Sequence, residues 1–246
     1  MPASGLDYNR VLLKISGEAL ASPDPLSKAP MGLSQEMLFK VASDIKKVHD
    51  TGVQVCLVVG GGNIYRGATG SREHGIDRVT SDYMGMLATV INGAALQNAL
   101  THVGLDCRLM SALPIPQIAE TYIREKAHHH LNKGRIVLFV AGCGNPYFTT
   151  DTAAALRASE LNCDLLLKAT KVDGVYTHDP IKQPEAKRFT SLKFTQVREE
   201  RLNVMDQAAF ALCDENTIPI AVFSVYEEDG FYKVISKTNN HTLITF

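Results

Sequence analysis

The stretch Val55-Cys56-Leu57-Val58-Val59-Gly60-Gly61-Gly62-Asn63 decides the fold. Its apolar, valine-rich first half predicts a buried strand. The three glycines leave a turn without side chains, so backbone N–H groups can approach a phosphate. Arg66 follows and offers a bidentate cation for phosphate oxygens. The stretch indicates a phosphate site at the carboxyl end of a parallel strand, where open α/β sheets bind ligands. The alternative is a tight strand–helix turn without a ligand.

The rest of the chain alternates between strand patterns and helix patterns. We expect strands at residues 10–16, 53–59, 107–110, 135–141, 164–168, 220–225 and 242–245. We expect helices at residues 34–50, 82–104, 115–131, 151–161 and 204–214, the first two capped by Ser34 and Asp82. This alternation predicts an α/β fold: a three-layer αβα sandwich with a mostly parallel central sheet. Since no linker divides the chain, we expect a single domain over residues 1–246 with a soft boundary near Thr150.

Composition excludes several classes of partner. The chain has 246 residues, of which 45% are hydrophobic and 21% charged, and its net charge is −1. It therefore lacks the bulk basic charge that binds nucleic acid and the polybasic run that binds membranes. No apolar stretch approaches the length of a membrane span, and Met1–Arg10 is too polar for a signal peptide. We expect a cytoplasmic protein.

The cysteines and histidines do not predict a disulfide framework or a metal site. The five cysteines are far apart, and none forms a C-x-x-C pair. Four should be small core residues, and the fifth, Cys143, lies in a glycine-rich loop: the five are Cys56, Cys107, Cys143, Cys163 and Cys213. Residues His128-His129-His130 would point in different directions on a helix, so we favour a solvated face over a metal site.

Two common nucleotide-binding motifs are absent. A P-loop needs Gly-Lys followed by Ser or Thr, and Gly-Lys occurs nowhere in the sequence. A dinucleotide fingerprint that starts at Gly60 needs Gly or Ala at position 65, which is Tyr65. Asp82 stands where the acidic ribose ligand would fall, but we expect it to open a helix. A P-loop kinase is excluded, and hydride transfer is disfavoured.

Three further segments place polar groups after predicted strands. Lys14-Ile15-Ser16-Gly17-Glu18 puts a lysine inside an apolar run, which favours phosphate contact over an edge lysine that reaches solvent. Gly142–Asp151 joins glycines and hydroxyls to a helix N-terminus, which favours an anion or a polar ring over a loop capped by Thr150 or Asp151. Lys168–Tyr176, followed by Asp179, offers groups for a base and a ribose; the alternative is a loop with solvated charges.

In this order, six segments resemble the bacterial uridylate (UMP) kinases of the amino-acid kinase superfamily. They are LLKISGEAL (12–20), GGGNIYRG (60–67), DYMGMLA (82–88), GNPYFTTD (144–151), KATKVDGVY (168–176) and VMDQAA (204–209). The resemblance extends over nearly the whole chain. It implies transfer of the γ-phosphoryl group of ATP to UMP with Mg²⁺ in pyrimidine nucleotide biosynthesis, and a homohexamer activated by GTP and inhibited by UTP. It also implies a UMP-binding lobe over residues 1–150 and an ATP-binding lobe over residues 151–246.

The resemblance also implies roles for individual residues. The expected catalytic residues are Lys14, Arg66 and Asp151, of which Asp151 orients the lysine. The expected ATP-binding residues are Lys14, Ile15, Ser16, Gly17, Gly62, Arg66, Thr170, Tyr176 and Asp179. The expected UMP-binding residues are Gly61, Asp82, Cys143, Gly144, Asn145, Pro146, Tyr147, Phe148, Thr149 and Thr150. No protein ligand to a metal is expected, because Mg²⁺ would arrive with the ATP phosphates.

The sequence departs from the family pattern at two points, and two other functions stay open. Residues Ala21–Pro30 form a longer, proline-rich loop than is usual, and Cys143 stands where threonine is usual. One alternative is a sibling kinase that phosphorylates a carboxylate or carbamate, although such kinases lack the GNP-aromatic-FTTD loop. The other is a nucleotide-binding storage or sensor protein without catalysis, although Lys14 and Asp151 are both present.

Overall fold

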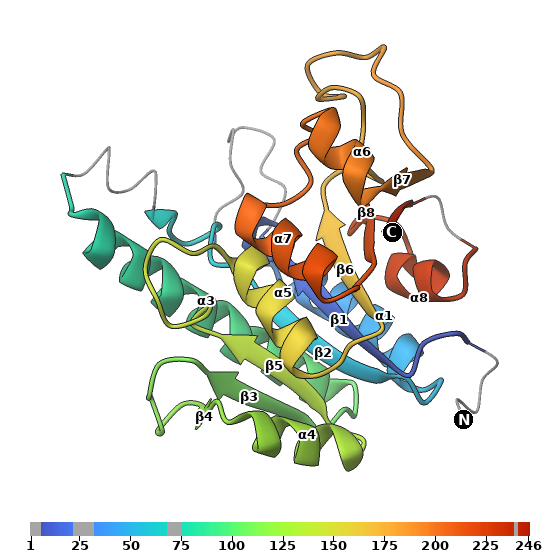
Figure 1. Cartoon of the computed structure of the whole chain (residues 1–246). Helices are drawn as coiled ribbons and strands as arrows, with labels where there is room; N and C mark the ends of the chain where they lie inside the picture. Colours follow the sequence, from blue (N-terminus) through green and yellow to red (C-terminus); the bar gives the residue numbers. More distant parts are fainter. Residues whose placement is uncertain (1–5, 22–31, 68–74, 239–240) are drawn as a thin grey trace.

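One nine-stranded sheet forms the centre of the computed structural model, which describes residues 6–21, 32–67, 75–238 and 241–246 (Figure 1). The strands are β1 (Arg10–Ile15), β2 (Gln54–Val59), β3 (Cys107–Ser111), β4 (Glu120–Thr121), β5 (Ile136–Val140), β6 (Leu165–Thr170), β7 (Ser191–Lys193), β8 (Ile220–Ser224) and β9 (Thr242–Thr245). The helices are the 3₁₀ turn η1 (Gly17–Leu20), α1 (Gln35–His49), α3 (Arg78–His102), α4 (Arg124–Asn132), α5 (Thr150–Glu160), α6 (Phe194–Glu199), α7 (Gln207–Glu215) and α8 (Gly230–Ile235).

The strand order is β4-β3-β5-β2-β1-β6-β8-β9-β7. Every pair in this order is parallel except β8 with β9. Since parallel strands end at the same edge, the loops after β5, β2, β1 and β6 are neighbours. The predicted mostly parallel sheet is confirmed, and it brings together the segments that sequence analysis singled out.

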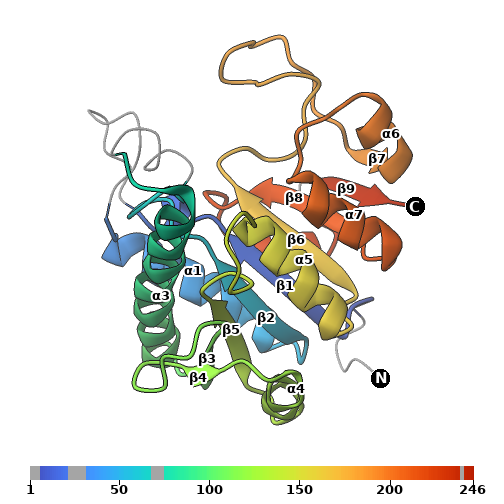
Figure 2. The same cartoon turned by 60° about the vertical axis from the view of Figure 1, so that its left-hand side comes forward.

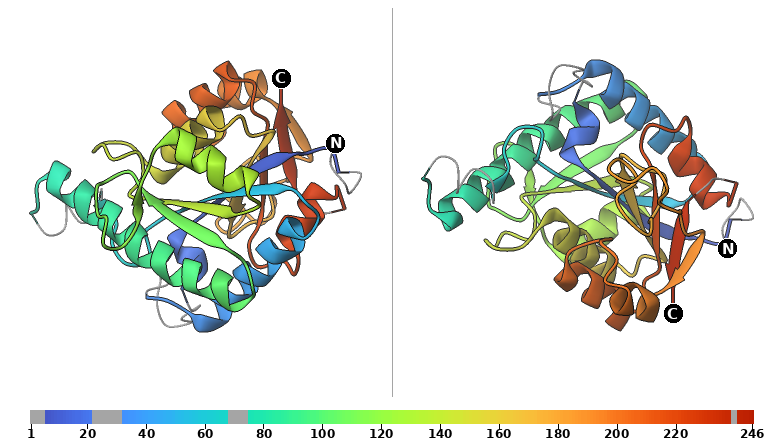
Figure 3. Two further views of the ribbon diagram at one scale, coloured as in Figure 1. Left: turned by 90° about the horizontal axis from the view of Figure 1, so that it is seen from below. Right: turned by 90° about the horizontal axis from the view of Figure 1, so that it is seen from above.

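Helices cover both faces of the sheet, as Figures 2 and 3 show. Alternate residues of β1 face opposite layers, as the two-residue period of a strand requires. Val11, Leu13 and Ile15 belong to one buried cluster with residues of α1, α3 and α8. Leu12 belongs to a second cluster with residues of α4, α5 and α7. The two cores on either side of one sheet confirm the predicted three-layer sandwich.

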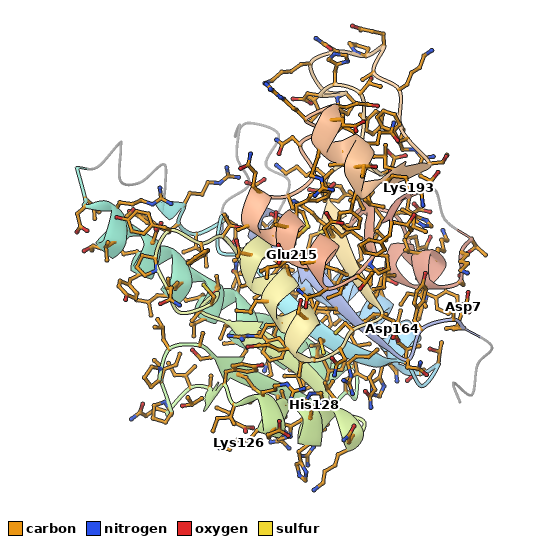
Figure 4. All side chains as sticks on the ribbon, in the orientation of Figure 1. Asp7, Lys126, His128, Asp164, Lys193 and Glu215 are labelled. Carbon is orange, nitrogen blue, oxygen red and sulfur yellow. The ribbon has the colours of Figure 1, made fainter. Side chains whose placement is uncertain are left out.

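Many charged side chains lie on the surface, and one of them fixes the start of β1. Charged side chains such as Lys126 on α4 and Glu215 on α7 are exposed (Figure 4). Asp164, also labelled there, accepts hydrogen bonds from the backbone N–H groups of Asn9 (2.6 Å) and Arg10 (2.9 Å), which fixes the start of β1 beside β6. Among the described residues, we find no helix with the length and apolar character needed to cross a membrane.

Three predicted helix boundaries are wrong. Helix α3 starts at Arg78, because Asp77 accepts hydrogen bonds from the N–H groups of Val79 and Thr80; Asp82 therefore lies inside the helix. The segment expected as a helix over residues 115–131 contains the short strand β4, and α4 begins only at Arg124. Proline at position 116 disfavours a helical conformation just before it. Helix α7 starts at Gln207, after its cap Asp206.

Candidate active site

Two adjoining cavities open at the carboxyl edge of the sheet. The first has a volume of about 580 Å³ and lies among the loops after β1, β2 and β5. The second has a volume of about 520 Å³ and lies beside the segment that follows β6. The two cavities share Lys168, Asn203 and Val204 as lining residues. A molecule in one cavity would thus lie next to a molecule in the other.

Two lysines and an aspartate form a buried cluster where the cavities meet. Lys14 on β1 and Lys168 on β6 are directly paired in the sheet, so their side chains leave the same face. The Asp151 carboxylate, in the first turn of α5, receives Lys14 Nζ at 2.8 Å and Lys168 Nζ at 2.7 Å. Lys168 Nζ also donates to the Val204 carbonyl at 2.6 Å. The cluster holds two ammonium groups in fixed positions at the floor of the cleft.

Electrostatics in this cluster follow from burial and pairing. Burial alone would raise the pKa of the Asp151 carboxyl, but the Lys14 and Lys168 ammonium groups outweigh it and hold that pKa below its ordinary value. Burial lowers the pKa of Lys168, against the opposing attraction of Asp151. Asp151 is therefore ionised near neutral pH, and it orients both lysines.

A second cluster of one carboxylate and two cations lies at the rim of the cleft. Glu18, in η1, forms ion pairs with Arg66 and Lys171. Arg66 comes from the segment after β2, and Lys171 comes directly after β6. The sequence pattern predicts phosphate binding by Arg66, but it predicts no individual role for Glu18 or Lys171. The arrangement places two cations from different loops around one carboxylate.

The glycines of the cleft are required by close packing. A Cβ atom on Gly17 would lie 2.4 Å from Asn63 Oδ1 and 2.7 Å from the Gly60 carbonyl oxygen. A Cβ atom on Gly61 would lie 2.8 Å from Ala88 Cβ on α3. All three distances are shorter than side chains tolerate. Glycine at these positions lets the loops after β1 and β2 pack against each other and against α3.

Helix α3 holds the loop that follows β5. The Thr89 hydroxyl accepts a hydrogen bond from the N–H of Ala141 at 2.7 Å. Asp82 accepts one from the N–H of Tyr147 at 2.8 Å, and it also receives Arg78 through both carboxylate oxygens. Ala141 and Tyr147 have positive φ angles of 62° and 70°, which non-glycine residues seldom adopt. These anchors fix an otherwise unfavourable loop conformation over the first cavity.

Asp206 joins the loop after β5 to α7. It caps α7 through the N–H of Ala209 at 2.9 Å. Its other carboxylate oxygen accepts hydrogen bonds from the hydroxyls of Thr149 (2.5 Å) and Thr152 (3.0 Å). Thr149 is itself the cap of α5, so the alternative in which Thr150 or Asp151 caps this helix names the wrong residue. The sequence contained a signal for Asp206, because an aspartate directly before a helical pattern predicts a cap.

Most of the expected site residues line the two cavities. Those at the first cavity are Lys14, Ser16, Gly17, Gly61, Gly62, Arg66, Asp82, Cys143, Asn145, Phe148, Thr149, Thr150 and Asp151. Those at the second cavity are Thr170, Tyr176 and Asp179. The other four, which line neither cavity, are Ile15, Gly144, Pro146 and Tyr147. The Ile15 side chain is buried in the core, and its carbonyl already accepts the N–H of Gly60 at 2.9 Å.

Of the cysteine and histidine side chains, Cys143 lines the first cavity and His178 lines the second. Cys56, Cys107, Cys163 and Cys213 are buried free thiols, as predicted. His130 is buried rather than solvated, because its Nε2 contacts Glu120 at 3.1 Å. Over the described part of the chain, no three His, Cys, Asp or Glu side chains gather where they could hold a metal ion. The longer loop noted at Ala21–Pro30 lies almost wholly outside the described residues.

Adjoining cavities with fixed lysines at their junction are typical of an enzyme that moves a phosphoryl group between two bound molecules. The chain belongs to the amino acid kinase family, which it matches over residues 9–224, and within that family to the uridylate kinases. This membership makes it a kinase.

The relatives agree along nearly the whole chain. The sequence is 50% identical over 242 residues to the uridylate kinase of Paramagnetospirillum magneticum, covering 98% of each chain. It is 48% identical over 237 residues to the uridylate kinase of Zymomonas mobilis, covering 96% of each. The crystal structure of UMP kinase from Ureaplasma parvum superposes with a TM-score of 0.89 at 36% identity, covering 96% of this chain and 98% of that one. The UMP kinase of Bacillus anthracis gives a TM-score of 0.89 at 39% identity, with 97% and 96% covered. The resemblance seen in the sequence is confirmed.

Proposed function

We propose that this protein transfers the γ-phosphoryl group of ATP to UMP, giving ADP and UDP for pyrimidine nucleotide biosynthesis. The observation that carries the proposal is the pair of cavities that adjoin at Lys168. Two nucleotides bound there would meet end to end over the Lys14–Asp151–Lys168 cluster. The names of the relatives supply the choice of uracil and phosphate as the acceptor.

The acceptor belongs in the first cavity and the donor nucleoside in the second. The first cavity has hydroxyl, amide and carboxylate groups for a ribose and a base edge, from Asp82, Asn145 and Thr150. The second has the ring of Tyr176 and apolar side chains such as Val222 for a purine. This division matches a lobe boundary near residue 150 only in part, because Lys14 and Ser16 would serve the ATP phosphates from the first lobe.

The transfer itself needs positioning and charge neutralisation. Lys14 and Arg66 would neutralise charge on the migrating phosphoryl group, together with the N–H groups of the loops at Gly17 and Gly62. In-line transfer of this kind asks little covalent chemistry of the protein. The acceptor phosphate is mostly dianionic at neutral pH, so no general base is required.

Mg²⁺ fits the site as a companion of the ATP phosphates. It prefers to keep several waters and to bind substrate phosphates with one or two carboxylates at most. The carboxylates of the cleft suit this, because each already has partners and together they do not form a ready cage. Asp151 and Glu18 are each bound to two cations. Asp82 is bound to Arg78, and Asp206 accepts from two threonine hydroxyls. When bound, the ion would neutralise charge on the β- and γ-phosphate oxygens.

The proposal extends to assembly as a homohexamer and to regulation by nucleotides, as the family resemblance implies. Helix α3 has a row of exposed apolar side chains at four-residue spacing: Val79, Tyr83, Leu87 and Ile91. Leu87 and Ile91 expose 51% and 52% of their surface, and a contiguous exposed apolar row marks a site of protein–protein contact. This row supports contact between copies in a homohexamer. Activation by GTP, inhibition by UTP and a cytoplasmic location complete the proposal.

A coupled assay of ADP release tests the function. Purified protein with Mg-ATP is offered UMP, CMP, a carboxylate and a carbamate in separate reactions. Release with UMP is the expected result. Release with only the carboxylate or carbamate would support the sibling kinase instead. ATP binding without release for any acceptor would favour the storage or sensor protein.

A further inference from the structure

Glu18 is an unexpected residue for a cleft that binds polyanions. Its side chain lines the first cavity and is only 10% exposed. A carboxylate there repels every phosphate that enters, so it should weaken binding unless it contributes something else. Its sequence context alone predicts no separate role for it.

Its place in the sheet explains which groups it can reach. β1 lies between β2 and β6, and Glu18 is in the turn directly after β1. Arg66 approaches from the β2 side, and Lys171 Nζ approaches from the β6 side, 2.6 Å from Glu18 Oε2. Glu18 therefore joins a cation that lines the first cavity, Arg66, to a cation whose two chain neighbours line the second cavity.

The three partners differ in how firmly they are held. Glu18 is fixed in a buried turn, whereas the side chains of Arg66 and Lys171 are 57% and 41% exposed. The cations can swing into solvent, but the carboxylate cannot follow them. Solvent also screens these ion pairs, so they are weak enough for a phosphate to displace.

We infer that Glu18 is a positioning residue: it holds Arg66 and Lys171 at the junction of the two nucleotides until phosphates take both cations from it. This role rests on the proposed function. Glu18 keeps two mutually repelling cations close together in the empty enzyme, and phosphates then compete with it for them. The Glu18 carboxylate therefore weakens the binding of polyphosphates. It also speeds phosphoryl transfer, because the two cations are already in place.

If phosphates compete with Glu18 for the two cations, removing the charge of Glu18 should strengthen polyphosphate binding and slow phosphoryl transfer. In Glu18→Gln the competing charge is gone, so inorganic tripolyphosphate should bind about fivefold more tightly, the upper range for one screened ion pair. Turnover should fall roughly tenfold, because Arg66 and Lys171 lose their common partner. Damage to the fold would instead weaken binding and slow turnover together.

Titration calorimetry with tripolyphosphate, kcat for UMP and thermal unfolding test the inference on the full-length protein. Glu125→Gln on the exposed surface of α4 is the matched control and should leave all three unchanged. Weaker or unchanged tripolyphosphate binding in folded Glu18→Gln would overturn the inference.

Glu18→Asp keeps the charge but shortens its reach, so it should bind tripolyphosphate like the wild type and turn over more slowly. If Glu18→Gln does not fold, this variant decides alone, and an unchanged kcat refutes the inference. Tripolyphosphate binding involves no acceptor, so a failure of the proposed UMP kinase activity would appear separately, as wild-type protein that binds tripolyphosphate but releases no ADP.

Discussion

Two clusters in the cleft have the same charges and different surroundings. Each joins one carboxylate to two cations: Asp151 to Lys14 and Lys168, and Glu18 to Arg66 and Lys171. In the first cluster all three side chains are at most 16% exposed, whereas the two cations of the second are 57% and 41% exposed. The difference in exposure indicates that burial decides the part a charged group plays. A buried ion pair supports the fold and stays intact, whereas a solvent-exposed cation can leave its carboxylate for another anion.

The largest effect should come from Asp151→Asn. It leaves two ammonium groups buried side by side without a counter-charge, so the free energy of unfolding should fall by about 3–5 kcal/mol. Urea denaturation measures the change. Asp50→Asn, which removes the same charge from an exposed ion pair with Lys46, should cost less than about 0.5 kcal/mol. Equal losses in the two variants would show that burial does not separate the clusters.

Lys14→Ala should affect both turnover and stability. We expect kcat for ADP release to fall by about 10²–10³, because a fixed cation beside the migrating phosphoryl group is lost. Unfolding should also occur at lower urea concentration, since Asp151 loses one of its two partners. Lys126→Ala on the outer side of α4 is the control and should change neither. A wild-type rate for Lys14→Ala would remove this lysine from the mechanism.

Arg66→Ala should affect turnover alone. Its kcat should fall in the same range of about 10²–10³, while the free energy of unfolding stays within about 0.5 kcal/mol of the wild type, because the guanidinium is exposed. Arg124→Ala removes an arginine of similar exposure, 48% against 57%, from a surface ion pair and serves as the control for both measurements. Marked destabilisation by Arg66→Ala would contradict the view that the rim cluster is exchangeable.

The smallest expected effect is the change in the free energy of unfolding at acid pH. The pKa of Asp151 lies below its ordinary value of 3.8 in the folded protein, so its pairing stabilises the fold fully above pH 3.8. That contribution disappears as pH falls from 3.8 through the lower pKa of the folded state. The gap in unfolding free energy between the wild type and Asp151→Asn should narrow over this range. Denaturation series at successive pH values measure it, and a constant gap would count against the pairing.

Sequence patterns were most reliable for the buried strands. The run Val55–Val59 became part of β2, and β9 has the predicted bounds, Thr242–Thr245. Buried parallel strands are nearly continuous apolar runs, so their pattern is hard to miss. The predicted start of α3 is wrong because Asp77 and Asp82 are both suitable helix caps. Only the hydrogen bonds that Asp77 accepts from the N–H groups of Val79 and Thr80 decide between them.

The sequence predicted single charged residues of the site but not the clusters that they form. The apolar run around Lys14 predicts a phosphate contact for that lysine. Lys168 has the same feature at the end of the predicted strand DLLLK, but it falls in the segment expected to bind a base and a ribose. Their direct pairing depends on strand order, which puts β6 beside β1 although more than a hundred residues separate them. Local patterns do not contain that information, so the second lysine and Glu18 emerged only in three dimensions.

The packed glycines have a consequence for reading related genomes. Gly17 and Gly61 are needed wherever these two loops meet each other and α3, whether or not a nucleotide ever binds. A relative that has lost its activity would therefore keep the glycine run for as long as it keeps the fold. The lysines on neighbouring strands are under the opposite pressure, because buried charge is expensive to retain without a use. Under the proposed function, catalytic competence among distant relatives should accordingly be judged by positions 14, 151 and 168, and the glycines should be taken as evidence of ancestry.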